Sequence, residues 1–207
     1  MTLLAALDYT SVFIFALTGA LVASRAQLDI VGFVFVACLT AVGGGTIRDV
    51  LLNRDPVFWI ANPEFIAVGA IAALIVFLTA HKLESRMRGI IWLDAAALAV
   101  AVPAGVGVAV SLGHSGTVVV IMGISTGCFG GLMRDVVCNE VPLVLKQGEL
   151  YVTCALTGAL AATGALELDL GLPAALIACA VTTFALRAGS IGLGWQLPIY
   201  KSRPPRP

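Results

Sequence analysis

Two short polar motifs lie within otherwise apolar stretches of the sequence. The first, residues 43–49, reads GGGTIRD, and the second, residues 130–135, reads GGLMRD. Successive glycines loosen a helix and free backbone carbonyl groups, while Arg and Asp bring charge into an apolar surrounding. Carbonyl, hydroxyl and carboxylate oxygens can replace part of the water shell of a cation. Both motifs are therefore candidates for lining a polar path.

The composition indicates that this path lies in a membrane. Of the 207 residues, 59% are hydrophobic and only 12% are charged, with a mean hydropathy of +1.01. A soluble domain has about twice that charged fraction. Apolar runs recur along nearly the whole chain, which predicts an all-α polytopic membrane protein. The formal net charge is zero and basic residues form no long block, so nucleic acid is excluded as a partner.

Seven stretches have about the length and apolar character of a membrane-spanning helix. They cover residues 8–24, 30–52, 63–80, 90–112, 117–138, 149–166 and 172–195. We expect one transmembrane domain over residues 1–207, with short connections and a short tail at 196–207. The glycine motifs fall near the ends of the second and fifth spans.

The positions of Lys and Arg predict how the chain crosses the membrane, because cytoplasmic loops carry an excess of them. Arg25 follows the first span, and Lys82, Arg86 and Arg88 follow the third; the tail holds three more basic residues. The connections after the fourth and sixth spans have no Lys or Arg. This pattern predicts an N-terminus outside and a C-terminus in the cytoplasm.

The chain aligns with itself without a gap when it is shifted by 86 residues. The shift superimposes Arg48-Asp49 on Arg134-Asp135, and likewise Asp8 on Asp94, Asn53 on Asn139 and Pro56 on Pro142. This predicts two three-span repeats, at about residues 3–82 and 89–168, with a seventh helix at about 172–195. Since each repeat has an odd number of spans, the repeats are expected to be inverted relative to each other, as in many transport proteins.

The glycines have two interpretations. Small residues let helices approach closely, which is sufficient for the scattered glycines. For the two clusters we favour a kink that turns carbonyl oxygens toward a path, because successive glycines cost a helix about 1 kcal/mol each relative to Ala. Hydroxyl groups of Thr46, Ser125 and Thr126 lie near the same level.

The two Arg-Asp pairs also have two interpretations. Neighbours in a helix point about 100° apart, so partners across the bundle are expected for each arginine, with Asp8 and Asp94 as candidates. In the structural interpretation, Arg48 and Arg134 only hold helix ends together. In the functional one, the two neighbouring aspartates form the acidic lining of a cation path. A bare Arg facing lipid is costly, so both arginines should face protein or water.

Other chemistry is weakly supported by the sequence. The five cysteines lie in apolar segments without the spacing of a metal site or disulfide framework, and no catalytic triad or phosphate-binding loop is present. We therefore expect no enzyme, no cofactor and no tightly bound metal. The basic residues Lys82, Arg86 and Arg88 either contact anionic lipid head groups or only set the topology.

With these motifs and repeats, the chain resembles the trimeric intracellular cation (TRIC) channel family, in particular its prokaryotic members, which are also described as a glycine-transporter-domain family. The resemblance implies a homotrimer with a pore in each protomer, conducting K⁺ and also Na⁺. It also implies that the second and fifth spans line the pore at their glycine motifs. The short end at 201–207 fits a bacterial plasma-membrane protein. The pore-lining or gating residues expected here are Gly43, Gly44, Gly45, Thr46, Arg48, Asp49, Ser125, Thr126, Gly130, Gly131, Arg134 and Asp135.

Two other functions stay open at this point. Inverted repeats with broken helices also serve secondary transporters, and either motif arginine could hold the carboxylate of an amino acid or another small zwitterion. A scaffold without transport activity is the third possibility, although buried charge would be unusual for one.

Overall fold

The described residues form an all-helical bundle. The computed structural model describes residues 2–82, 86–146 and 150–198, without the side chain of Arg86. Within these ranges the elements are α1 (Leu3–Arg25), α2 (Ile30–Leu51), α3 (Phe58–Ala61), α4 (Glu64–Thr79), η1 (Ala80–Lys82), α5 (Arg86–Ser111), α6 (Gly116–Val137), η2 (Leu143–Leu145), α7 (Val152–Glu167) and α8 (Leu172–Leu193).

Six of these segments are long and apolar enough to cross a membrane: α1, α2, α4 with η1, α5, α6 and α8. The remaining candidate is α7, an apolar helix of 16 residues, whereas a span usually needs about 20. The span predicted at residues 149–166 thus corresponds to a shorter helix, and its first residue lies outside the described ranges. The fold is that of a polytopic, all-α membrane protein.

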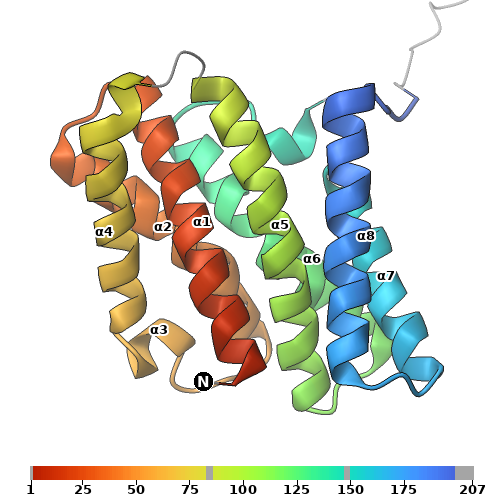
Figure 1. Cartoon of the computed structure of the whole chain (residues 1–207). Helices are drawn as coiled ribbons and strands as arrows, with labels where there is room; N and C mark the ends of the chain where they lie inside the picture. The colour runs from red at the N-terminus through yellow and green to blue at the C-terminus, as the bar shows by residue number, and fades with distance from the viewer. Residues whose placement is uncertain (1, 83–85, 147–149, 199–207) are drawn as a thin grey trace, which may run out of the picture.

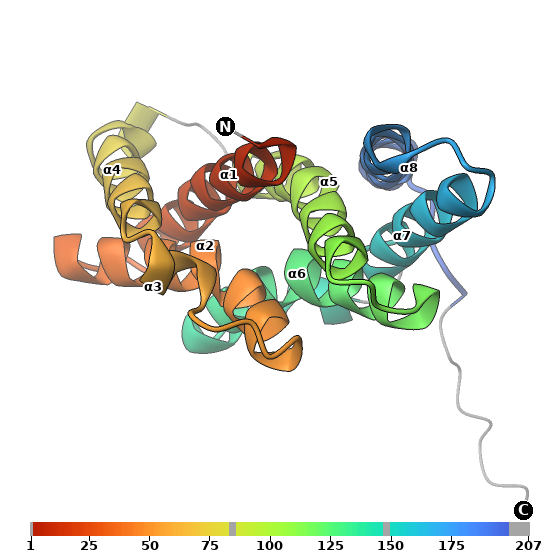
Figure 2. The same cartoon turned by 90° about the horizontal axis from the view of Figure 1, so that it is seen from below.

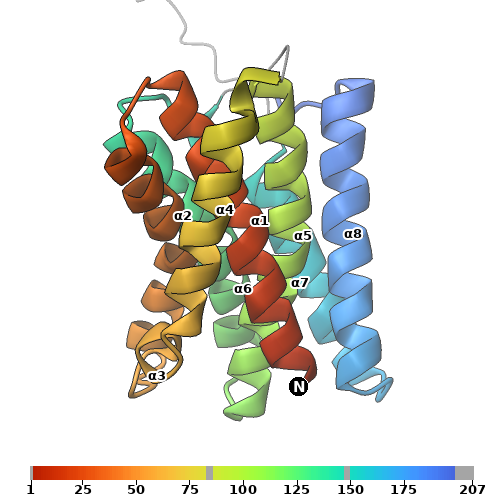
Figure 3. The same cartoon turned by 60° about the vertical axis from the view of Figure 1, so that its left-hand side comes forward.

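Helices α1, α2, α5 and α6 form the centre of the bundle. Helix α1 packs against α2, α4 and α5, while α5 packs against α6, α7 and α8, and α2 contacts α6 directly. Figure 1 shows α1 leading away from the end that holds the N-terminus and α5 returning toward it. Seen from below in Figure 2, α2 and α6 cross one face of the α1–α5 pair, and the turned view in Figure 3 shows α4 and α8 on opposite sides of it.

Helices α2 and α6, the second and fifth predicted spans, have matching bounds. The first residue of α6 lies 86 positions after the first residue of α2, and the same holds for their last residues. Each helix is followed by a turn whose Asn has a positive φ, 50° at Asn53 and 54° at Asn139. Asn tolerates this left-handed conformation better than most residues, and it reverses the chain out of the helix. The turns place both Arg-Asp pairs at the ends of their helices.

The glycine motifs do not interrupt these helices. Both α2 and α6 are continuous α-helices of 22 residues through their glycines, so the helical hydrogen bonding that the sequence suggested would be loosened there is not interrupted. The direction of α2 changes along its length in Figure 2. The carbonyl groups at the motifs therefore remain within a helical backbone.

The glycines instead bring backbones into contact. A methyl group on Gly44 would meet the carbonyl oxygen of Thr126, and one on Gly130 would meet that of Thr40. A methyl group on Gly45 would lie 2.6 Å from the Phe58 ring. Close approach between α2 and α6 is thus the observed role of Gly44 and Gly130, as in other small-residue contacts between membrane helices.

We expect Gly44→Ala and Gly130→Ala to lower the thermal stability of the purified protein. Alanine gains about 1 kcal/mol of helix propensity over glycine, but overlap with a backbone carbonyl cannot be relieved by a rotamer change and costs about 1–3 kcal/mol. Melting in detergent, followed by size-exclusion chromatography, measures the effect.

The matched control is Gly131→Ala. Its methyl group would meet nothing closer than 3.5 Å, so the propensity gain is unopposed and the melting temperature should stay or rise. Equal destabilisation by all three variants would contradict the backbone contact between α2 and α6.

Candidate functional site

The first charged cluster surrounds Arg48, in the last turn of α2. Its Nε donates to Asp49 Oδ1 at 2.8 Å, and its Nη1 donates to Asp8 Oδ1 of α1 at 2.9 Å. The guanidinium lies over the Phe58 ring, 5.4 Å from its centroid, and the side chain is fully buried. A cation at a helix C-terminus is favoured by the helix dipole, and two carboxylates offset its desolvation.

Asp49 also fixes the chain that follows α2. Its Oδ2 accepts a hydrogen bond from the backbone N–H of Phe58 at 2.8 Å, and Arg54 Nη1 lies 3.5 Å from its Oδ1. Because both carboxylate oxygens have donors, Asp49 links the helix end, the turn and α3. This carboxylate therefore has a structural role.

The second cluster, around Arg134 in the last turn of α6, repeats this arrangement. Arg134 Nε donates to Asp135 Oδ1 at 2.7 Å, and its Nη1 donates to Asp94 Oδ1 of α5 at 2.9 Å. Asp135 Oδ2 accepts from the backbone N–H of Leu143, at the start of η2, at 2.9 Å. A further bond runs from Arg134 Nη1 to the Thr18 hydroxyl of α1 at 2.8 Å, which joins the two halves.

The structure thus places Asp8 beside Arg48 and Asp94 beside Arg134, across the bundle. It also pairs each arginine with the next residue in its own helix, for which the sequence offered no expectation. The Nη2 atoms of both arginines are buried and have no hydrogen-bond partner among the described residues. Each cluster therefore retains one buried guanidinium nitrogen whose N–H groups have no acceptor within this part of the chain.

Two cavities approach these clusters from opposite ends of the bundle. The first, here called the Asp8 cavity, has a volume of about 290 Å³ and lies at the end that holds the N-terminus, where α1, α3 and α5 meet. It is lined by Thr2, Leu4, Ala5, Asp8, Arg54, Phe58, Asn62, Phe65, Val108, Ser111 and Leu112.

The second, here called the Arg134 cavity, has a volume of about 260 Å³. Its lining includes Arg134 and Asp135, together with Arg25 and Glu140, whose side chains form a half-exposed ion pair of 3.1 Å. Lys146 adds a third basic side chain to this cavity. The two cavities therefore reach the two clusters from opposite sides.

A narrow recess of about 10 Å³ lies beyond Asp8, deeper in the bundle. Ser11, Thr40 and Thr126 contribute hydroxyl groups to it, and Gly44 and Gly45 contribute backbone. Gly44 and Thr126, which form one of the backbone contacts between α2 and α6 described above, are part of its lining.

The pore-lining residues predicted from the sequence fall into two groups, those that line one of these spaces and those that do not. Gly44, Gly45, Thr126, Arg134 and Asp135 line the recess or the Arg134 cavity. The others line none of the three spaces described above: Gly43, Thr46, Arg48, Asp49, Ser125, Gly130 and Gly131. The Thr46 hydroxyl, for example, accepts from Trp59 Nε1 at 2.9 Å and donates to the Val42 carbonyl.

Two residues of the second cluster were missed in the sequence. Thr18 contacts Arg134, and the Tyr151 hydroxyl donates to Asp94 Oδ2. The shift of 86 residues provides a signal for Tyr151, because it places this tyrosine on Phe65 of the first repeat.

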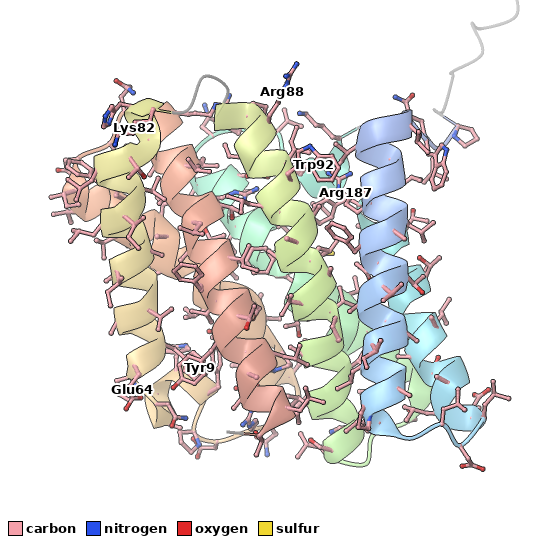
Figure 4. All side chains as sticks on the ribbon, viewed as in Figure 1. Tyr9, Glu64, Lys82, Arg88, Trp92 and Arg187 are labelled. Atoms are coloured by element: carbon pink, nitrogen blue, oxygen red, sulfur yellow. The ribbon has the colours of Figure 1, made fainter. Side chains whose placement is uncertain are left out.

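The basic residues considered for lipid head groups lie at one end of the bundle. Figure 4 shows Lys82 and Arg88 at the end opposite Glu64, and both are exposed. The side chain of Arg86 lies outside the described residues. Within the described ranges, no three His, Cys, Asp or Glu side chains gather as they would around a metal ion.

The comparisons with known proteins agree with this architecture. A family model described as "Glycine transporter" matches residues 5–81 and, 86 positions later, residues 91–167. The UPF0126 membrane protein of Vibrio cholerae is 36% identical over 96% of this chain and 83% of its own. The UPF0126 inner membrane protein YadS of Escherichia coli is 33% identical over 94% of each chain.

Solved structures give the same result. Crystal structures of the TRIC trimeric intracellular cation channel orthologue from Rhodobacter sphaeroides match with a TM-score of 0.90 and 39% identity, over 94% of this chain and all of that one. A TRIC cation channel studied for the structural basis of its conductance matches with a TM-score of 0.87 and 29% identity, over 98% and 100% of the two chains. The resemblance inferred from the two motifs is confirmed, and the chain belongs to the TRIC channel family as a prokaryotic member.

Proposed function

We propose that the chain forms a channel for monovalent cations, permeable to K⁺ and Na⁺, with one conduction path inside each protomer of a homotrimer. The observation that carries the proposal is the pair of cavities at opposite ends of the bundle, one lined by Asp8 and Arg54 and the other by Arg134 and Asp135. The solved relatives, which are TRIC cation channels, support the same function.

The proposed topology has seven spans, with α7 as the sixth, in two inverted repeats. Support comes from the two family matches 86 residues apart and from the opposite directions of α1 and α5 in Figure 1. The N-terminus lies outside and the C-terminus in the cytoplasm, so the Asp8 cavity faces out and the Arg134 cavity faces in. An inner-membrane location is supported by the name of the Escherichia coli relative.

The proposed path runs from the Asp8 cavity through the recess, past Gly44 and Thr126, and into the Arg134 cavity. Hydroxyl groups of Ser11, Thr40 and Thr126 would contact a partly dehydrated ion. Because the contact between α2 and α6 is made of backbone at glycines, a small separation of the two helices opens it without moving a bulky side chain. We assign the role of gate to this contact.

The carboxylates have different roles in this proposal. Asp49 and Asp135 each accept from an arginine and from a backbone N–H, so they lock the helix ends. Asp8 has one oxygen bonded to Arg48 and lines both the Asp8 cavity and the recess. Asp8 is therefore the carboxylate that attracts the permeant cation, with Asp135 contributing at the other mouth.

A secondary transporter for a small amino acid is the second candidate. The Nη2 atoms of Arg48 and Arg134, which have no hydrogen-bond partner in the part of the chain that the structure describes, favour it, since an arginine can hold a carboxylate. The description of the family model favours it as well. Saturable counterflow of labelled glycine in proteoliposomes, without unitary currents, would establish it in place of the channel.

Recording the purified protein in planar bilayers tests the channel directly. We expect discrete unitary currents that, in a K⁺ gradient with an impermeant anion, reverse at the K⁺ equilibrium potential. Bi-ionic K⁺/Na⁺ conditions give the permeability ratio. Absence of unitary events at every voltage and gradient would overturn the proposal.

We expect Asp8→Asn to lower the unitary K⁺ conductance at low salt by at least about twofold, because it removes the charge that concentrates cations in a narrow cavity. The effect should shrink as ionic strength rises. The matched control is Asp169→Asn, the same change in an exposed turn where the residue has φ of 54°, a conformation that Asn accepts. Equal conductance of both variants and the native chain would show that Asp8 does not line the path.

We expect Arg134→Ala to lower the stability of the folded protein by about 3–5 kcal/mol, because it leaves two buried carboxylates without their cation. The matched control is Arg25→Ala, which removes a half-exposed ion pair worth about 0–1 kcal/mol. Thermal or denaturant unfolding of the two variants in the same detergent measures the difference. Similar stabilities would show that the buried cluster does not hold α6 in place.

A further inference from the structure

A further cavity lies away from the proposed path, where the end of α5, the start of α6 and the end of α7 meet. Its volume is about 300 Å³. In Figure 1 the connection from α7 to α8 lies at the same end of the bundle as the N-terminus. This space, here called the Glu167 cavity, has an apolar lining from Val110, Val119 and Leu166 and a polar lining from His114, Thr163 and Glu167.

The first repeat fills the equivalent position with its own side chains. The shift of 86 residues places Val119 on Phe33 and Thr163 on Phe77. The rings of Phe33 and Phe77 pack edge to face, with their centroids 5.0 Å apart. The second repeat has smaller side chains at both positions, and both of them line the Glu167 cavity. The space is therefore a difference between the two repeats, and it leaves room for a ligand.

The polar groups of the cavity favour a ligand that carries a cationic N–H donor. The Thr163 hydroxyl donates to the Leu160 carbonyl at 2.9 Å, so its oxygen offers only lone pairs to a ligand. Glu167, when ionised, also only accepts, and it lies in the last turn of α7, where the helix dipole favours a cation. A neutral His114 can donate one N–H to an anionic group of the same ligand.

The charges of the neighbouring chain agree with this. The connections at residues 112–115 and 168–171 contain no Lys or Arg, and the second of them adds the carboxylate of Asp169. A ligand without a positive charge would therefore find no cation in these connections and two carboxylates close in the sequence. Charge complementarity thus selects a zwitterion or a cation over an anion.

The apolar part of the cavity indicates that this ligand is a lipid. Val119 and Leu166 belong to helices α6 and α7, while the exposed side chains of Leu112, Leu168 and Leu170 follow α5 and α7 directly. In a membrane, exposed leucines beside helix ends lie where head groups meet hydrocarbon. Phosphatidylethanolamine carries a primary ammonium, a phosphate and acyl chains in the order in which the cavity offers carboxylate, imidazole and apolar side chains.

We propose that the Glu167 cavity is a binding site for phosphatidylethanolamine from the leaflet at the N-terminal end of the bundle. The ammonium binds the Glu167 carboxylate and the Thr163 hydroxyl oxygen, His114 donates to the phosphate, and an acyl chain begins along Val119 and Leu166. The lipid occupies the space that the rings of the first repeat fill with protein. The inference does not rest on ion conduction and holds for a channel or a transporter.

Native mass spectrometry of the delipidated protein in detergent tests the site, with dioleoyl forms of phosphatidylethanolamine, phosphatidylcholine and phosphatidylglycerol added in turn. Phosphatidylethanolamine should bind each protomer at least about tenfold more tightly than phosphatidylcholine, whose ammonium has no N–H to donate to a charged acceptor. Phosphatidylglycerol, which has no cation, should bind more weakly still. Equal binding of the three lipids would overturn the proposal.

Two variants assign the preference to this cavity. Glu167→Gln should abolish the preference for phosphatidylethanolamine, whereas Asp169→Asn, the same kind of change at an exposed carboxylate that does not line the cavity, should keep it. Thr163→Phe introduces the side chain that the first repeat has at this position, and it should displace the lipid without lowering the melting temperature. An unchanged preference in Glu167→Gln, or a lipid retained by Thr163→Phe, would contradict the site.

Two further outcomes would assign the cavity to another occupant and overturn the lipid. Dissociation of the oligomer in Thr163→Phe, followed by size-exclusion chromatography, would show that a neighbouring copy of the chain covers the cavity. Displacement of the lipid by an equal concentration of soluble phosphoethanolamine would show that the acyl chains contribute nothing. Because both readouts measure mass and not current, an absence of unitary currents would overturn the channel and leave the lipid site in place.

Discussion

The pairing of a buried arginine with two aspartates is the constraint on which the rest of this structure depends. An unpaired guanidinium within a bilayer is costly, and so is an unpaired carboxylate. At Arg48 and Arg134 the charges offset one another within 3 Å, and the second oxygen of each neighbouring aspartate accepts from the chain that follows the helix. These bonds fix the ends of α2 and α6 relative to α1 and α5, beside the two cavities.

The need for glycine where α2 and α6 cross follows from this constraint. With the helix ends held by charge, α2 and α6 can cross in direct backbone contact only where side chains are absent, and Gly44 and Gly130 meet that condition. The contact leaves the recess narrow and lined by hydroxyl groups. The same residues therefore account for the tight packing of the bundle and, in the proposed channel, for the place where it opens.

Much of this arrangement could be predicted from the sequence. The shift of 86 residues matched Arg48-Asp49, Asp8 and Asn53 with their equivalents in the second repeat. The length of the apolar stretches predicted where the long helices lie. What could not be predicted was the state of the helix at the glycines, because helix propensity is a local cost that a tertiary contact can offset. The hydrogen bond from Tyr151 to Asp94 was missed, because a tyrosine among apolar residues gives no indication of its partner in the sequence.

The length of α7 has a consequence for the surrounding lipid. Its 16 residues rise about 24 Å along the helix axis, whereas the hydrocarbon core of a bilayer is about 30 Å thick. The outer surface of α7 carries exposed leucines such as Leu156 and Leu160, so this side of the bundle presents a short apolar band. If α7 is a span, as in the proposed topology, acyl chains beside it must compress unless a neighbouring protein surface replaces them. In that topology, a protomer is matched to a thinner bilayer beside α7 than beside the 22-residue helix α2.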